Sequence, residues 1–396
     1  MGIKINGIQT TGGSNVSVID ALTSASKTAA LSANQGRLLK QMIDTIPTQS
    51  GGSGGTVTSK AAAPAAGYEL FTYDVDCGLE DRTDRLQSTN VQGAVDVSTD
   101  VSLIKFPGAY MASGKPTRLV IYNHGASSSL PAVNMTEYAE KYTNALISAG
   151  YAVLFVNGLP VKFRDKRYAS YDGLCFGGPL YLRSAIAAYN YVTGKYNIAT
   201  DGCFVVGQSM GGLATVNLVN AGVLPIKAIA VDAPVLDLYN DAYKSGGWAS
   251  GTLAGGTATA IAWAFQFDGF DWAAGKYTTD GSIYKAVSNI NAGENADATA
   301  IWQANQEKIA GYNPFETGKF MTDSSHYGIK LPCPVMVWHG ETDGTNQISI
   351  SRAWVDMLRR GGTIAYMRTV KTNVHCVWRT ADEYSTEMAN WLNRWK

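Results

Sequence analysis

From about residue 61 to the C-terminus, short apolar runs alternate with longer stretches in which apolar residues recur at helical spacing. Strands that alternate with helices predict a parallel sheet covered by helices on both faces. The predicted strands are Leu119–Asn123, Ala152–Asn157, Phe204–Gly207, Ala228–Val231, Val335–Trp338 and Ile364–Val370, and the predicted helices lie near 136–149, 179–193, 211–221, 347–360 and 383–395.

Two further apolar runs, near 68–76 and 101–110, precede this alternation. With no helix pattern between them, they predict an antiparallel edge on the same sheet. We therefore expect one α/β domain over residues 61–396.

The alternation is interrupted at 236–330, which has no clear sheet strand and is rich in aromatic residues. An insertion of this length is more typical of a functional lid than of a loop. We expect most of its aromatic side chains to form the lid's own small core, with Trp248 and Trp263 as candidates to face a ligand.

The first 60 residues differ from the rest, because they are polar and contain no aromatic residue. An apolar stripe predicts a short helix over Asn34–Ile46, which Pro47 ends. We assign 1–47 to a small N-terminal helical arm and 48–60 to a flexible Gly/Ser/Thr linker, either a natural hinge or an engineered join.

Composition narrows the range of functions. Lys plus Arg and Asp plus Glu number 32 each, so the formal net charge is zero, which favours a neutral substrate over nucleic acid or an anionic membrane. The five cysteines are scattered without a C-x-x-C pair, so neither a metal site nor any other cofactor is expected. We expect no signal peptide and no membrane span.

The strongest chemical motif is G-x-S-x-G, in which an apolar run delivers Ser209 between Gly207 and Gly211 just before a helix pattern. A serine on such a strand-to-helix turn has its hydroxyl exposed above the sheet. Another copy, at 51–55, has no strand before it and fits a linker. Ser209 is therefore the candidate nucleophile.

A serine nucleophile needs a base, and the base needs an orienting acid. Of the four histidines, His375 follows the last predicted strand, at the same edge of the sheet as Ser209. Asp343 follows the strand before it and is the preferred acid, with Glu341 and Asp232 as rivals. The predicted triad is Ser209, His375 and Asp343.

Acyl transfer also needs N–H donors for the oxyanion. One is the amide of Met210, directly after the nucleophile. The other is expected in the turn after the first parallel strand, with Ala126 preferred over Ser127. His124, which begins this turn, is expected to brace it through a ring hydrogen bond.

Two further residues are candidates for substrate contact. His326 lies at the end of the predicted lid, and Tyr171 lies in a tyrosine-rich loop after the second parallel strand. For both, an ordinary loop role is the alternative.

The chain order Ser209, Asp343, His375, with the strand pattern and the His124-Gly125 turn, resembles the α/β-hydrolase family and its lid-bearing serine esterases over about 61–396. The resemblance implies an α/β-hydrolase fold and acyl transfer through a covalent acyl-enzyme. The turn reads His-Gly-Ala-Ser instead of His-Gly-Gly-Gly, which leaves the second oxyanion donor open.

Residues 26–39 resemble a stretch found in tail-fibre and baseplate proteins of bacteriophages. The resemblance implies a virion-attachment segment that contacts tail or baseplate proteins, and such segments are commonly trimeric. An ordinary helical arm is the alternative.

Together these features predict a phage tail esterase, made in the bacterial cytoplasm, that removes acyl groups, above all acetyl, from a bacterial surface polysaccharide or a small ester. Two alternatives stay open: a peptidase or other hydrolase of the same fold, and a non-catalytic receptor-binding tail protein.

Overall fold

A computed structural model describes residues 3–5, 8–10, 60–76, 97–126, 143–158, 176–239 and 328–396, with single gaps at 63 and 114, and short stretches between 261 and 315. The chain divides into two compact units, Met1–Thr48 and Gln49–Lys396, and each is described by itself. The predicted helix at 34–46 lies outside the described residues.

The N-terminal unit contains a short hairpin that the sequence analysis did not predict. Strand β1 (Ile3–Ile5) pairs antiparallel with β2 (Ile8–Thr10), so that Ile5 lies opposite Ile8. The two residues between the strands are Asn6 and Gly7, a dipeptide typical of tight hairpin turns.

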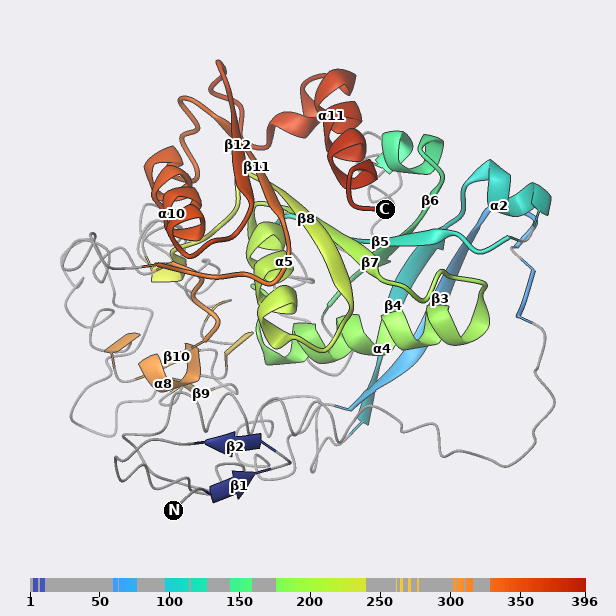
Figure 1. The fold of residues 1–396 in the computed structure, drawn as a ribbon, viewed down its shortest axis with the longest axis horizontal. Helices are drawn as coiled ribbons and strands as arrows, with labels where there is room; N and C mark the ends of the chain where they lie inside the picture. Colours follow the sequence, from blue (N-terminus) through green and yellow to red (C-terminus); the bar gives the residue numbers. More distant parts are fainter. Residues whose placement is uncertain are drawn as a thin grey trace. The chain divides into compact units, whose positions relative to one another are not determined.

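The larger unit is built on an eight-stranded sheet in the order β12-β11-β8-β7-β5-β6-β4-β3 (Figure 1). The six strands from β12 to β6 are parallel, so their carboxyl ends meet at one edge. Strand β4 pairs antiparallel with β6, and β3 pairs antiparallel with β4. The strands are β3 (Tyr68–Asp76), β4 (Val97–Lys105), β5 (Arg118–Asn123), β6 (Tyr151–Val156), β7 (Cys203–Gln208), β8 (Ile226–Asp232), β11 (Val335–Gly340) and β12 (Ala365–Val370).

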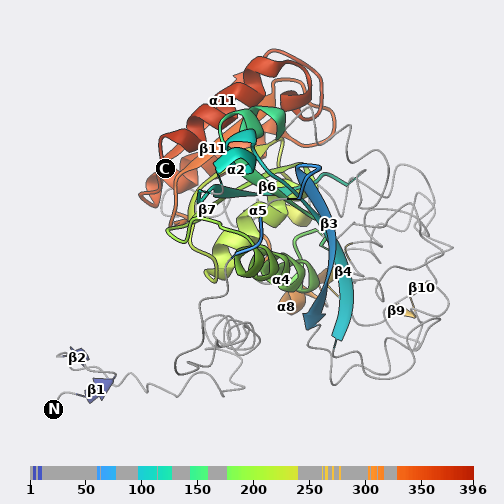
Figure 2. The ribbon, with the colours of Figure 1, turned by 90° about the vertical axis from the view of Figure 1, so that its right-hand side faces the viewer.

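Helices cover both faces of this sheet (Figure 2). Helices α4 (Pro179–Lys195) and α5 (Met210–Ala221) pack on one face. On the other face, α11 (Asp382–Asn393) and the helix at 143–148 close an apolar core with the strands. Helix α10 (Ile348–Arg360) packs against β11 and β12 at one end of the sheet. The fold class and the succession of parallel strands and helices are confirmed.

One predicted edge strand was placed too far along the chain. The expected strand at 101–110 is β4, which ends at Lys105, and helix α2 (Gly108–Ser113) occupies the following residues. Pro107 lies between the two elements, where it has no N–H to give to a strand ladder, and its carbonyl accepts from the Tyr110 amide at 3.0 Å. The proline therefore ends the strand and begins the helix.

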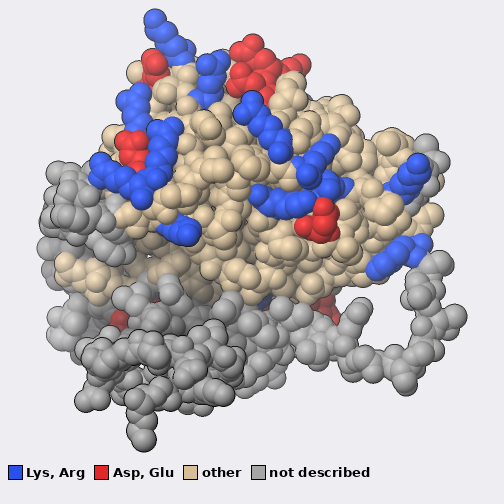
Figure 3. All heavy atoms as spheres, in the orientation of Figure 1, with Lys and Arg blue, Asp and Glu red and all other residues tan. Residues whose placement is uncertain are grey.

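The described surface mixes charges of both signs. On the face drawn in Figure 3, basic and acidic side chains are scattered over a larger uncharged area. One surface cluster pairs Asp201 with both Arg118 and Lys227, at 2.7 Å each. No helix within the described ranges has the length and apolarity needed to cross a membrane.

Candidate active site

Ser209 stands on a strained turn between β7 and α5. Its backbone has φ 53° and ψ −121°, a conformation that non-glycine residues rarely adopt. The turn is held by hydrogen bonds, since the Ser209 amide donates to Asp232 O at 2.9 Å and its carbonyl accepts from the amides of Gly212 and Val235. These bonds fix Ser209 at the end of β7, at the carboxyl edge of the sheet.

The glycines around Ser209 are required by close backbone contacts. A Cβ atom at Gly207 would lie 2.1 Å from Gly211 O, and one at Gly211 would lie 2.1 Å from Asn123 O. Neither position has room for a side chain, because the obstructing atoms belong to the backbone. The start of α5 is therefore packed directly against the ends of β7 and β5.

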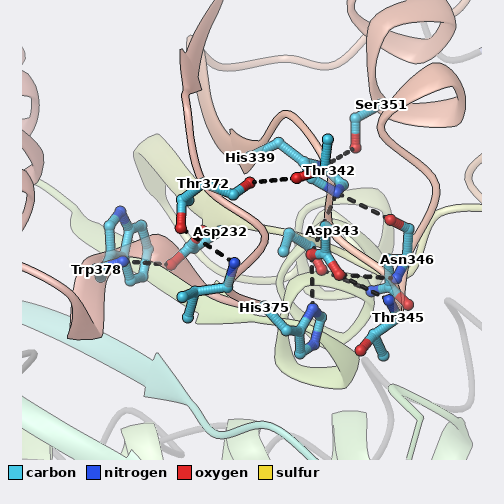
Figure 4. A network of polar contacts seen from close by, with 12 residues as sticks. Asp232, His339, Thr342, Asp343, Thr345, Asn346, Ser351, Thr372, His375 and Trp378 are labelled. Carbon is cyan, nitrogen blue, oxygen red and sulfur yellow. Dashed lines mark hydrogen bonds and ion pairs between the residues drawn. The ribbon is translucent and has the colours of Figure 1, made fainter.

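His375 and Asp343 come from loops after neighbouring strands, and the structure brings their side chains together. Nδ1 of His375 lies 2.7 Å from Oδ2 of Asp343 (Figure 4). The Asp343 side chain is fully buried, whereas that of His375 is 20% exposed. When Nδ1–H donates a hydrogen bond to the carboxylate, Nε2 is the ring nitrogen that is free to accept a proton.

The Asp343 carboxylate is held by several donors. Oδ1 accepts from the amides of Thr345 at 2.8 Å and Asn346 at 3.3 Å, and Nε2 of His339 lies 3.5 Å from Oδ2. Burial acts to raise the pKa of Asp343, but hydrogen bonds from His339, His375 and the Thr345 amide outweigh it and hold the pKa well below its usual range. Asp343 is thus an anion beside His375 at neutral pH.

The Asn346 side chain ties the acid loop to the strand next to the nucleophile. Its Nδ2 donates to Ala233 O at 2.6 Å, directly after β8, and the backbone carbonyl oxygen of Asn346 lies 3.2 Å from Nε2 of the buried His339. Nε2 of His339 therefore faces two acceptors and carries the proton, while Nδ1 meets the Ser351 hydroxyl at 2.9 Å. Sequence reasoning missed Asn346, whose only signal was its place three residues after Asp343.

The two rival acids lie elsewhere. Asp232, at the end of β8, is fully buried and its Oδ2 accepts from the Trp378 amide at 2.8 Å, while Oδ1 has no hydrogen-bond partner (Figure 4). Burial raises the pKa of Asp232 to about 7, against the effect of the Trp378 and Val377 amides. Glu341 is exposed. Asp232 thus supports the loop that follows His375, and only Asp343 hydrogen-bonds to the imidazole.

The turn after β5 lies against the nucleophile. A Cβ atom built on Gly125 would be 3.7 Å from Cβ of Ser209. His124 is buried, with Nδ1 2.8 Å from Gly125 O and Nε2 3.0 Å from Asn157 O. The predicted ring contacts of His124 with this turn are present, and Ala126 is exposed beside it.

Several predicted site residues cannot be placed. Ser127, Tyr171, Trp248, Trp263 and His326 lie outside the described residues. Within the predicted lid, the described aromatic residues Phe265, Trp302, Tyr312 and Phe315 are buried, and Phe265 meets Tyr312 edge-on at 5.5 Å. Two short strands there, β9 (Phe270–Asp271) and β10 (Lys276–Tyr277), pair only with each other.

Cys203, Cys333 and Cys376 are buried free thiols. Among the residues that the structure describes, no group of three or more His, Cys, Asp or Glu side chains is arranged to hold a metal ion.

Comparisons with known proteins found a sequence match near the N-terminus and structural matches to the larger unit. Residues 18–50 match the family of phage tail fiber repeats. The structure is similar to the rice cell wall degrading esterase LipA from Xanthomonas oryzae, with a TM-score of 0.52 and 14% identity over 83% of this chain and 91% of that one. The ligand-bound form of LipA gives 0.53 at the same identity and coverage. No curated protein sequence shows significant similarity to this chain. The larger unit has the α/β-hydrolase fold, and the N-terminal unit contains a phage tail fibre repeat.

Proposed function

We propose that this chain is a serine esterase in which Ser209 is the nucleophile, His375 the general base and Asp343 the orienting acid. The observation that carries the proposal is the 2.7 Å contact between Asp343 and His375 at the sheet edge where Ser209 stands on its strained turn. Free serine is a weak nucleophile, and this arrangement supplies the base and the anion that activate it.

The proposed reaction proceeds in two halves. Nε2 of His375 takes the proton of Ser209 Oγ as that oxygen attacks the ester carbonyl, and the amides of Met210 and Ala126 stabilise the oxyanion. The imidazolium then protonates the leaving alkoxide as the carbon–oxygen bond breaks, which leaves an acyl-serine. A water molecule, deprotonated by the same imidazole, then attacks the acyl carbon. The bond to Ser209 Oγ breaks, the imidazolium returns its proton to Oγ, and the carboxylic acid is released.

We infer that the substrate is an acylated, above all acetylated, polysaccharide of a bacterial surface, and that the protein acts as part of a phage tail. Two findings support this inference. The tail fibre repeat at 18–50 is typical of proteins on the virion. The fold relative LipA is described as a rice cell wall degrading esterase, so a protein of this fold acts on a cell wall.

The central test compares the wild-type chain with Ser209→Ala on p-nitrophenyl acetate and on isolated capsule or lipopolysaccharide, with released acetate measured directly. We expect hydrolysis that Ser209→Ala abolishes, and labelling of the wild type alone by a fluorophosphonate probe. Equal ester hydrolysis by both chains would refute the proposed nucleophile.

The same experiment separates the alternatives. A chain that labels with the probe and cleaves added peptide substrates, but releases no acetate from the polysaccharide, would be a peptidase of this fold. A chain that neither labels nor hydrolyses, yet binds host polysaccharide, would be a receptor-binding tail protein.

A further inference from the structure

The imidazole of His124 is clamped between two backbone carbonyl oxygens, and this arrangement limits where its proton can be. Nδ1 lies 2.8 Å from Gly125 O and Nε2 lies 3.0 Å from Asn157 O. A carbonyl oxygen only accepts, so each contact is a hydrogen bond only when that ring nitrogen carries a proton. Burial lowers the pKa of His124, against the effect of both carbonyls and of Asp100, which favours a neutral ring with a single N–H.

The position of that proton bears on the oxyanion donor, because Gly125 O and the Ala126 amide belong to the same peptide group. In a planar trans peptide the C=O and N–H bonds point in opposite directions. A group that holds Gly125 O therefore also sets the direction of the Ala126 N–H. Gly125 lies against Ser209, so this peptide is next to the nucleophile.

A buried polar network holds the other side of the ring. Nδ2 of Asn157 donates to Oδ1 of Asp100 at 3.2 Å, and the hydroxyl of Ser184 donates to Oδ2 of the same carboxylate at 2.6 Å. Asp100 also accepts from the Val101 amide at 2.7 Å. Asp100, Asn157 and Ser184 are fully buried, so β4, α4 and the loop after β6 form a fixed wall behind His124.

We propose that His124 is a positioning residue: its Nδ1–H donates to Gly125 O and so aims the Ala126 amide at the oxyanion. The shorter of the two ring contacts is the one at Nδ1, which favours the proton there. A neutral ring leaves one lone pair facing a carbonyl oxygen in either tautomer. With the proton on Nδ1 this repulsive contact is the longer one, to Asn157 O at 3.0 Å, and with the proton on Nε2 it would be the shorter one, to Gly125 O at 2.8 Å. The proposal rests on the esterase function proposed above.

Two substitutions of His124 test the roles of its two ring nitrogens separately. His124→Asn offers an N–H near the position of Nδ1, and His124→Gln offers one near the position of Nε2. We expect His124→Gln to lower kcat on p-nitrophenyl acetate about 100-fold, the effect of losing one oxyanion donor, with KM changed less than about threefold. His124→Asn should be at least tenfold faster than His124→Gln. The surface variant Asp201→Asn serves as a control that should match the wild type.

The outcomes are distinct. If the two His124 variants have equal kcat values, the ring only fills space. The same conclusion follows if kcat falls in proportion to the loss of thermal stability. If the wild type hydrolyses the ester, Ser209→Ala does not, and His124→Gln equals the wild type, the positioning role fails while the esterase function stands. A wild type without ester hydrolysis refutes the function instead.

A measurement on the full-length wild type remains decisive even if both variants fail to fold. Long-range proton–nitrogen NMR spectra of the chain labelled at histidine with nitrogen-15 report which ring nitrogen carries the proton. Signals of the other three histidines are identified through single substitutions. Protonation at Nδ1 supports the proposal, and protonation at Nε2 alone overturns it.

Discussion

Replacement of Gly211 by alanine tests whether the close contact between α5 and β5 sets the geometry of the site. The new Cβ would lie 2.1 Å from Asn123 O and 2.5 Å from His124 O, atoms that cannot rotate away because both belong to the backbone. Real Cβ contacts are essentially never shorter than 3.0 Å, so the gap between the helix and the strand end must open by about 0.9 Å.

This displacement predicts two separate losses. Overpacking of this kind costs about 1–3 kcal/mol of unfolding free energy. The strand end that moves carries His124 and the Ala126 amide, and a shift of about 1 Å in positioning groups costs about 100-fold in rate. We therefore expect Gly211→Ala to be both less stable and about 100-fold slower on p-nitrophenyl acetate.

The measurements are urea unfolding followed by circular dichroism, and kcat for ester hydrolysis at a temperature where the variant is folded. Gly194→Ala is the matched control, because a Cβ at this exposed position near the end of α4 meets nothing within 4 Å. Alanine favours helix over glycine, so this variant should be as stable as the wild type or slightly more stable. A Gly211→Ala chain with wild-type stability and rate would refute the packing argument.

Three further predictions concern the acid, a buried carboxyl and the N-terminal unit. Asp343→Asn should lower kcat about 10⁴-fold with little change in KM, as expected for loss of the anion that orients His375; a loss under tenfold would contradict this role. Since the folded-state pKa of Asp232, about 7, exceeds the value of about 3.9 for an unfolded Asp, stability should fall as pH rises from about 4 to about 7. Asp232→Asn, which keeps an acceptor for the Trp378 amide, should flatten that slope in urea titrations, and an unchanged slope would contradict the assignment. Removal of residues 1–60 should leave ester hydrolysis intact and reduce the mass measured by light scattering from an oligomer, a trimer in the simplest case, to one chain; equal masses would exclude an oligomerising role.

Most of the parallel sheet could be predicted because its strands are buried on both faces and appear in the sequence as continuous apolar runs. The ends of the strands are harder to predict, because a single residue can end a strand within a continuous apolar stretch. Pro107 ends β4 within an apolar stretch. The hairpin of β1 and β2 was missed although Asn6-Gly7 is a recognised turn signal, because the surrounding segment is polar.

The contact between Asp343 and His375 could be predicted because the chemistry requires few residue types at one sheet edge. Asp343 and His375 follow adjacent strands, and topology alone brings their loops together. The supporting groups could not be predicted in this way. The Asn346 amide reaches Ala233, 113 residues away in the chain, and Asn157 reaches Asp100 across strands whose pairing the sequence does not state. Such contacts depend on side-chain directions within the folded sheet, which periodicity does not specify.

Strands β8 and β11 are direct neighbours in the sheet, although about a hundred residues separate them in the chain. The intervening segment leaves the sheet at the carboxyl end of β8 and returns at the start of β11, where Val335 lies beside Ile229 of β8. An inserted segment that begins and ends at neighbouring strands can change in length or sequence while the two strands keep their positions. Under the function proposed above, we therefore expect substrate recognition to change within this segment without a change in the catalytic residues.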